Sequence, residues 1–196
     1  INGDDWDVPQ DNYLQFDTNL LYAQNIRLSY GQQVIALNST GPVTPNAPLN
    51  VQFENVDIGY IMQTFQDQDS LIAGVIDGTA TVSNILTGNL SFNSDLTVAD
   101  FAYEGVPVGD LALEASSAGE NRYNINAQLT DNGNQLLVDG FVETQPEATL
   151  LNLNANIANL NIGSLEGFTA GMVEQLDGSA KGQLRITGTV EQPNII

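Results

Sequence analysis

Apolar and polar residues alternate along most of the chain with a period of two. Between residues 150 and 163, Leu151, Leu153 and Ile157 point to one side of an extended backbone, and the asparagines between them point to the other. Such alternation predicts a β-strand with one dry face and one wet face. Segments with similar spacing recur throughout, and "DNGN" at 131–134 predicts a hairpin between two of them.

The strand pattern is also repeated on a longer scale. "FENVDIG" at 53–59 matches "IANLNIG" at 157–163, and "IDGTA" at 76–80 matches "LDGSA" at 176–180. The chain therefore holds about two copies of a unit of roughly 100 residues, and the second copy is truncated. We assign an acidic segment, the first unit and the second unit to residues 1–19, 20–121 and 122–196, within one continuous structure.

Both copies shift the phase of their dry face at the same place. Val51 and Phe53 place it at odd positions, whereas Val56 continues it at even ones; in the second copy the phase changes between Ile157 and Leu160. One extra residue per strand is what a β-bulge inserts. We expect a bulge in each copy, with an ordinary loop as the alternative.

One short amphipathic helix is expected in each unit. Ser164 is a candidate N-cap of the second helix. The apolar face of that helix would consist of Leu165, Phe168, Met172, Val173 and Leu176. In the first copy the stretch at 60–75 lies at the same place.

The dry faces of the strands require a cover. It can be a second sheet in a closed sandwich core, the same sheet curled on itself, or a bound apolar ligand. Because the unit repeats, we expect a mainly β fold: an elongated, curled antiparallel sheet, a taco-like trough or open barrel, with one short helix per repeat.

Charge and composition exclude several classes of function. The formal net charge is −20, which argues against binding to nucleic acid. The chain has no cysteine or histidine, so thiolate chemistry and the usual general base are missing. We expect no enzyme activity, cofactor or catalytic residue.

Acidic clusters are the candidates for a metal site. The carboxylates are Asp4, Asp5, Asp7 and Asp11 near the N-terminus, and Asp67 and Asp69 further along. Neither group has the spacing of a calcium loop. We interpret the first as a solvated terminal segment and the second as a loop, and expect no metal.

The ordered motifs resemble those of the TamB and AsmA-like family. "LDGSAKGQLRITGTVEQPNI" at 176–195 is similar to a recurrent pattern of that family, and "NIRLSYGQQVIALNST" at 25–40, followed by "PLNVQFENVDIG", is similar to the strand pair that precedes it. The resemblance covers most of residues 20–196. It departs from the family pattern in its strongly acidic charge.

The resemblance implies a long periplasmic protein of Gram-negative bacteria, anchored in the inner membrane and not enzymatic. It implies a role in outer-membrane biogenesis, through phospholipid transfer between the two membranes or through assembly of outer-membrane proteins. The implied partners are phospholipid acyl chains and an outer-membrane protein of the Omp85 class, such as TamA or a BamA-like protein. The chain does not begin with Met, and we expect it to be part of a longer protein.

On this hypothesis the dry face is a groove for acyl chains. Its candidate lining residues are Val51, Phe53, Leu90, Phe92, Leu111, Leu113, Ile125, Leu129, Val138, Leu151, Leu153 and Ile157. The alternative is a closed β-sandwich repeat of a surface adhesin or spacer protein, in which the same residues form a core.

Overall fold

The computed structural model describes residues 5–18, 20–45, 47–65, 71–86, 90–169, 172 and 175–196. Within these ranges the strands are β1 (Tyr13–Asp17), β2 (Leu20–Gln24), β3 (Ile26–Tyr30), β4 (Gln33–Ser39), β5 (Leu49–Asp57), β6 (Ile72–Ser83), β7 (Ser91–Tyr103), β8 (Val106–Ser117), β9 (Arg122–Asp131), β10 (Asn134–Thr144), β11 (Thr149–Asn161), β12 (Ser179–Thr189) and β13 (Pro193–Ile195). The helices are α1 (Ile58–Phe65) and the 3-10 helix η1 (Ile162–Thr169).

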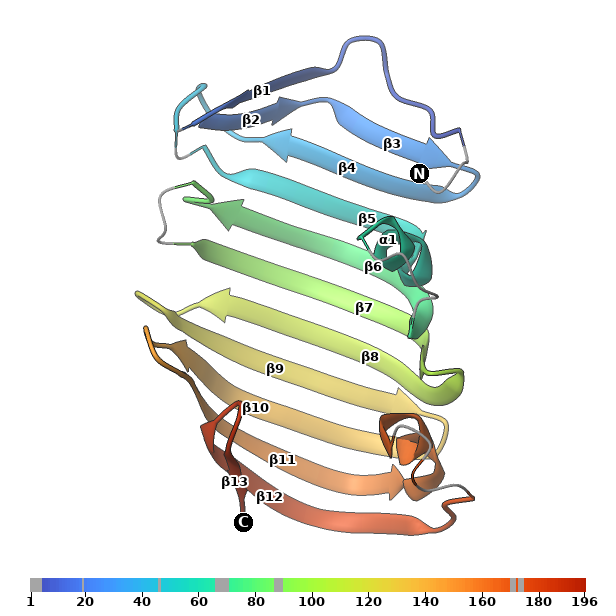
Figure 1. The fold of residues 1–196 in the computed structure, drawn as a ribbon. Helices are drawn as coiled ribbons and strands as arrows, with labels where there is room; N and C mark the ends of the chain where they lie inside the picture. The colour runs from blue at the N-terminus through green and yellow to red at the C-terminus, as the bar shows by residue number, and fades with distance from the viewer. Residues whose placement is uncertain are drawn as a thin grey trace.

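Strands β3 to β13 form one eleven-stranded antiparallel sheet in which every strand pairs with its neighbours in sequence (Figure 1). Strands β1 and β2 form a separate hairpin at the β3–β4 end of the molecule. The predicted mainly β fold is confirmed. The sheet runs from the first repeat unit into the second without interruption.

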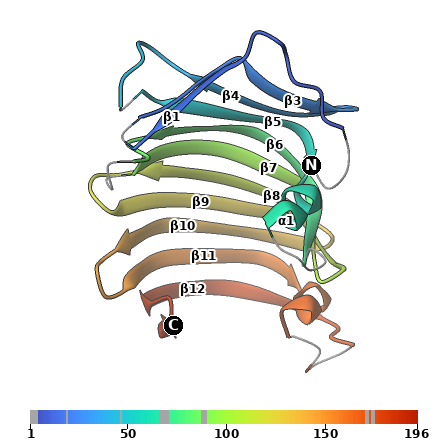
Figure 2. The same cartoon turned by 45° about the horizontal axis from the view of Figure 1, so that its top comes forward.

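The sheet is open, with β3 at one edge and β13 at the other. Its strands are bowed, as Figure 2 shows, but the edges do not approach one another. The strongly curled trough or barrel expected from the sequence is therefore not formed, and the dry face is not closed by the sheet itself.

The local signals for turns and bulges are confirmed. The turn between β9 and β10 has positive φ at Asn132 (45°) and Gly133 (77°), as a tight Asn-Gly hairpin requires. The register shifts between Phe53 and Val56 on β5, and between Ile157 and Leu160 on β11. Each bulge restores the apolar side chains to one face, which is the physical reason for the phase change.

Strand register refines the alignment of the two copies. Gly78 lies opposite Phe53, and Gly182 lies opposite Ile157. Measured from the bulges, Gly182 is therefore the counterpart of Gly78. The match of "IDGTA" with "LDGSA" would instead pair Gly78 with Gly178, so that block match is offset from the strand register.

Helix α1 begins directly after β5, where the backbone N–H of Gly59 donates to the Asp57 carboxylate at 2.8 Å. In the second copy, the Gly163 N–H donates to the side-chain oxygen of Asn161 at 3.1 Å. Asn161 is therefore the residue that caps η1. The prediction that Ser164 is the N-cap is wrong, because Ser164 lies inside the helix and its hydroxyl donates to the Asn161 carbonyl at 2.6 Å.

The predicted amphipathic face of the second helix is also wrong where the structure describes it; Val173 lies outside the described residues. In a 3-10 helix, residues three apart lie in one row, so Ser164 and Gly167 face the sheet together and are buried. Phe168 lies on another side and is 54% exposed, and Met172 lies beyond the helix and is 83% exposed. A close approach fixes this arrangement, because a Cβ on Gly167 would lie 2.3 Å from the Tyr103 carbonyl oxygen.

The N-terminal segment packs against the edge of the sheet. The backbone N–H of Asp7 donates to the Ser29 carbonyl at 2.9 Å, and the Ser29 N–H donates to the Asp7 carbonyl at 3.0 Å. The Trp6 ring lies 5.9 Å from Tyr30 and 6.4 Å from Tyr60 on α1. The segment predicted to be a solvated terminus therefore has exposed carboxylates but an anchored backbone and a half-buried indole.

Candidate functional site

One face of the sheet is apolar from β5 to β11. Because directly opposed residues of antiparallel strands share a face, the strand register defines transverse rows of side chains. We call the face that carries these rows the apolar face. Toward one end of the strands lies the rim row: Val82, Phe92, Ser117, Tyr123, Val142 and Leu151. Toward the other end lies the inner row: Val56, Ile76, Val98, Leu111, Leu129, Leu136 and Ile157.

Two middle rows separate the rim row from the inner row. The first consists of Val51, Ala80, Ser94, Ala115, Ile125, Gly140 and Leu153. The second consists of Phe53, Gly78, Leu96, Leu113, Ala127, Val138 and Ala155. From β6 to β11, every strand contributes at least one Gly, Ala or Ser to the middle rows. The side chains of the apolar face therefore rise less far above the sheet there than along its two borders.

The two glycines of the middle rows allow the strands to pair closely. A Cβ on Gly140 would lie 2.2 Å from the Asn152 carbonyl oxygen, and one on Gly78 would lie 2.2 Å from the Asp95 carbonyl oxygen. Both glycines also have positive φ, of 145° and 126°. Side chains are therefore excluded at these two positions by the sheet itself.

The β5–β7 part of the inner row is covered by helix α1. Val56 is fully buried, at 0% exposure, and forms a cluster with Ile76 and Val98 against which Ile61 of α1 packs. Helix η1 lies at the same end of the strands (Figure 1), where it packs against β8. The inner row is therefore buried from β5 to β7 and half-buried from β8 to β11.

A buried polar network holds η1 in place. The Asn134 amide donates to the Val108 carbonyl at 2.6 Å and to the Ser164 hydroxyl at 3.1 Å. Its side-chain oxygen accepts the Asn161 N–H at 2.8 Å. Sequence analysis missed Asn134 because its place in "DNGN" is explained fully by the hairpin turn.

Apart from the buried Ala155, the rim row and the middle rows are only half-buried from β6 to β11. At the rim, Phe92 and Tyr123 stack with their ring centroids 5.1 Å apart. Burial of a large apolar side chain stabilises by about 1.5–3 kcal/mol, so these rows leave part of that free energy unrealised. The uncovered area is a surface that can accept an apolar ligand.

All of the predicted lining residues except Leu90 lie on the apolar face. Leu90 lies outside the strands, just before β7, and is 42% exposed. Tyr123, Val142 and Val82 of the rim row were not among the predicted residues. Their alternation is visible in the sequence, but their alignment with Phe92 and Leu151 follows only from the strand register. The role of the set in lipid binding stays a prediction.

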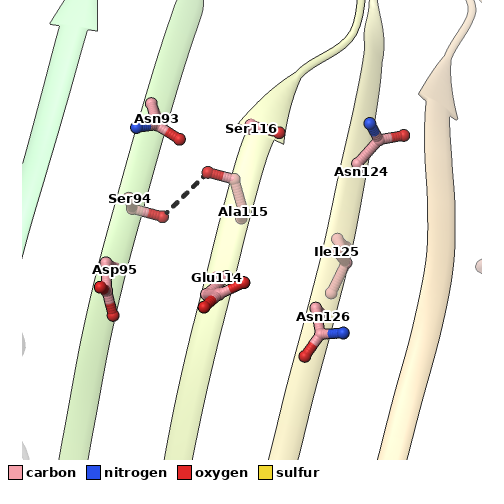
Figure 3. A pocket seen from close by; sticks show the side chains of 9 residues that line it. All are labelled: Asn93, Ser94, Asp95, Glu114, Ala115, Ser116, Asn124, Ile125 and Asn126. Atoms are coloured by element: carbon pink, nitrogen blue, oxygen red, sulfur yellow. Dashed lines mark hydrogen bonds between the residues drawn. The ribbon is translucent and has the colours of Figure 1, made fainter.

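The opposite face carries the polar side chains, and we call it the polar face. One transverse row on it contains Asp95, Glu114, Asn126, Asp139 and Asn154. A hollow of about 340 Å³ lies over β7, β8 and β9 on this face, and Figure 3 shows the polar side chains that line it. The Asp95 and Glu114 carboxylates are directly opposed there, so the hollow is acidic.

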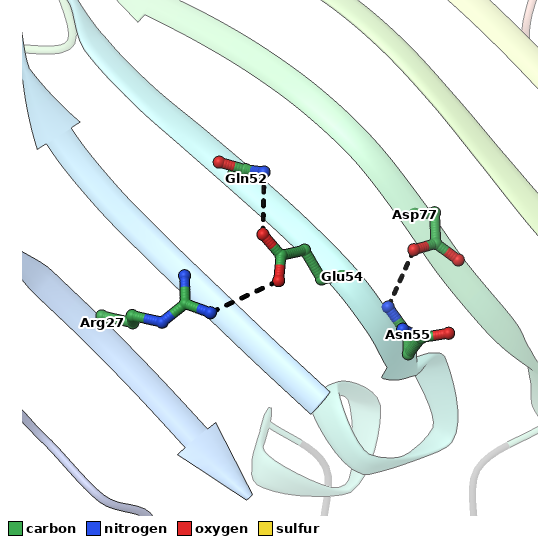
Figure 4. A network of polar contacts seen from close by, with 5 residues as sticks. All are labelled: Arg27, Gln52, Glu54, Asn55 and Asp77. Carbon is green, nitrogen blue, oxygen red and sulfur yellow. Dashed lines mark hydrogen bonds and ion pairs between the residues drawn. The ribbon is translucent and has the colours of Figure 1, made fainter. Parts of the chain in front are cut away.

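The four cationic residues of the chain are all described, and all lie on the polar face. Arg27 forms an exposed ion pair with Glu54 at 3.4 Å, and Glu54 also accepts a hydrogen bond from Gln52, as Figure 4 shows. The Arg122 guanidinium lies 3.6 Å from the centroid of Phe141. On β12, Arg185 lies opposite Asn154 and therefore on the polar face. Lys181 is on the same face, because it is four residues from Arg185 on the same strand and alternates with Gly182 and Leu184.

In the part of the chain that the structure describes, no group of three or more His, Cys, Asp or Glu side chains could hold a metal ion. Asp5, Asp7 and Asp11 are exposed, whereas Asp4, Asp67 and Asp69 lie outside the described residues. Among the described helices, none is long and apolar enough to cross a membrane.

Comparison of the chain with protein-family models, with curated proteins and with solved structures gives no match. The assignment of a function therefore depends on the apolar face and on the motifs of the sequence.

Proposed function

We propose that this chain is a non-enzymatic segment of a TamB or AsmA-like periplasmic protein, and that its apolar face carries phospholipid acyl chains between the inner and outer membranes. The observation that carries the proposal is the apolar face, whose rows run from β5 to β11 and are mostly half-buried at the rim and in the middle. The motifs at 25–40 and 176–195 resemble those of this family, and the resemblance implies the periplasmic setting, the inner-membrane anchor and an outer-membrane partner of the Omp85 class.

The dimensions of the face fit an acyl chain. From Phe92 in the rim row to Val98 in the inner row the strand rises about 20 Å, at about 3.3 Å per residue. Half of the hydrocarbon core of a bilayer is about 15 Å. An acyl chain can therefore lie along a strand, with its methyl end toward the inner row. The low middle rows let it pass sideways from strand to strand.

The strongly curled trough expected from the sequence would enclose the lipid by itself. In the open sheet, α1 and η1 lie along one border, and the bound acyl chains supply the remaining cover. Lipid binding then contributes to the stability of the sheet, because apolar surface leaves water on both partners.

Native mass spectrometry of the protein, purified without detergent from a Gram-negative host, tests the proposal together with lipid extraction of the same sample. Phospholipid adducts are expected for the wild type and for Asn154→Asp, whose side chain is on the polar face. They are expected to be lost in Leu153→Asp, which places a carboxylate between Gly140 and Ile186 on the apolar face. Urea unfolding of all three proteins checks that each is folded.

A wild type that is free of lipid and unfolds cooperatively would overturn the proposal. Equal lipid content in Leu153→Asp and Asn154→Asp would show that bound lipid lies elsewhere on the molecule.

A further inference from the structure

Positive charge is missing from the apolar face. Its rows contain no Lys or Arg, since Arg27, Arg122, Lys181 and Arg185 are all on the polar face. Arg27 is paired with Glu54, and the Arg122 guanidinium is held over the Phe141 ring. A phosphate group on the apolar face therefore meets no cationic side chain within its rows, and Arg122, at the turn that follows β8, is engaged with Phe141 on the polar face.

Negative charge is present along the uncovered border of that face. The turns that follow β8, β10 and β12 form the border next to the rim row. Each of these turns carries one exposed glutamate: Glu120, Glu147 and Glu191. These turns belong to alternate hairpins along the side of the sheet that is opposite to α1 and η1 (Figure 1).

The buried part of the inner row determines which end of a lipid can reach this border. Val56, Ile76 and Val98 on β5 to β7 are buried beneath α1, so a hydrated head group is excluded there by the cost of burying a charge. The methyl ends of the acyl chains fit that end of the face, and the head group emerges at the rim row. It then lies beside Glu120, Glu147 or Glu191.

On the basis of the proposed function, we propose that the apolar face selects phospholipids by head-group charge: it takes zwitterionic lipids that carry an ammonium group, of the phosphatidylethanolamine type, and disfavours lipids of net negative charge. The ammonium group complements the rim glutamates and donates hydrogen bonds to them. The phosphate alone, as in phosphatidylglycerol, meets only like charge. A molecule with a net charge of −20 adds to that repulsion over a distance of about one Debye length, about 8–10 Å.

A competition between two lipids tests this selection. The purified chain is incubated with vesicles that contain equal amounts of phosphatidylethanolamine and phosphatidylglycerol with identical acyl chains, and is then separated from them. Bound lipid is quantified by mass spectrometry. Since both lipids share one vesicle, approach of the protein to the membrane does not bias the result. We expect bound phosphatidylethanolamine to exceed phosphatidylglycerol at least about threefold, as exposed charge pairs allow.

Charge-reversed variants locate the selection. The triple variant Glu120→Lys/Glu147→Lys/Glu191→Lys places cations at the rim and should reverse the preference toward phosphatidylglycerol. Its matched control is Asp95→Lys/Glu114→Lys/Asp139→Lys, which changes the net charge equally but acts on the polar face. The control should keep the wild-type ratio. In about 1 M salt, where the Debye length is about 3 Å, the wild-type preference should vanish.

Uptake of uncharged monoolein separates this inference from the proposed function. If monoolein binds and the two phospholipids bind equally, head-group selection is wrong while the apolar site stands. If both triple variants change the ratio equally, selection comes from net charge, and the rim assignment is overturned. If neither monoolein nor phospholipid binds, the proposed function itself fails.

Discussion

Gln33 and Asn134 occupy equivalent positions in the two repeat units, and each binds the equivalent backbone N–H group. The side-chain oxygen of Gln33 accepts the Asp57 N–H at 2.9 Å, and that of Asn134 accepts the Asn161 N–H at 2.8 Å. In each unit this bond joins the first residue of one strand to the last residue of the bulged strand beside it, where a helix begins. The bond fixes the corner at which the chain leaves the sheet to cover the inner row.

The two corners are expected to differ in their contribution to stability. Asn134→Ala removes the partners of buried groups, including the Val108 carbonyl, and should lower the free energy of unfolding by about 2–3 kcal/mol. Gln33→Ala affects a more accessible corner and should cost about 1 kcal/mol or less. Urea unfolding measures both values. Equal losses would contradict the assignment of Asn134 to a buried network.

The glycines of the sheet provide a matched pair of tests. Gly140→Ala would place a Cβ 2.2 Å from the Asn152 carbonyl oxygen in a residue with φ of 145°, and should destabilise the protein by at least about 2 kcal/mol. At Gly182 no atom lies within 4 Å of the added Cβ. Gly182→Ala should therefore change stability by no more than about 0.5 kcal/mol. Thermal unfolding of both variants decides between them; a tolerated Gly140→Ala would show that β10 and β11 pair less closely.

The opposed carboxylates of the polar face are expected to cost stability. Glu114 lies directly opposite Asp95, and like charges in that relationship repel. Glu114→Gln should raise the free energy of unfolding by about 0.2–1 kcal/mol, and the gain should disappear in about 1 M salt. Glu54→Gln is the control, because it removes the partner of Arg27 and should not stabilise the protein. Denaturant unfolding at two salt concentrations provides the measurement.

The attachment of η1 can be tested through its aromatic contact. The rings of Phe168 and Tyr103 are stacked, with centroids 4.4 Å apart and planes at 4°. Phe168→Ala should reduce hydrogen-exchange protection of the η1 amides by an amount equivalent to about 0.5–1.5 kcal/mol. Met172→Ala, at a residue that is 83% exposed, should leave that protection unchanged. An unaltered exchange pattern in both variants would mean that the stack does not hold the helix.

Periodicity in the sequence predicts the sheet well because a strand is a local object. The alternation of Leu151 and Leu153 with asparagines identifies the dry face, and the phase change at Ile157 identifies the bulge. The turn at Asn132 and Gly133 follows from their tolerance of positive φ. Each of these signals depends on adjacent residues alone.

Long-range contacts limit the prediction of the rest. The apolar periodicity of η1 favours an α-helix, but the approach of Gly167 to the Tyr103 carbonyl, which belongs to the other repeat unit, accompanies a 3-10 helix instead. Trp6 stands among acidic residues that indicate solvation, yet it packs against Tyr30. These partner residues lie outside the two segments, so the periodicity within either segment does not reveal them.

The strict sequence order of the eleven strands has a mechanical consequence. Tension applied between the outermost strands acts across all of the hairpins in series, and the weakest strand pair must open first. Extension would then proceed by peeling, with one strand released at a time and a sawtooth of small forces. Because each strand of the sheet pairs with its neighbours in sequence, each released strand can re-pair at once when the load falls. Such a sheet behaves as a reversible spring of hairpins, able to change its span without losing its remaining structure.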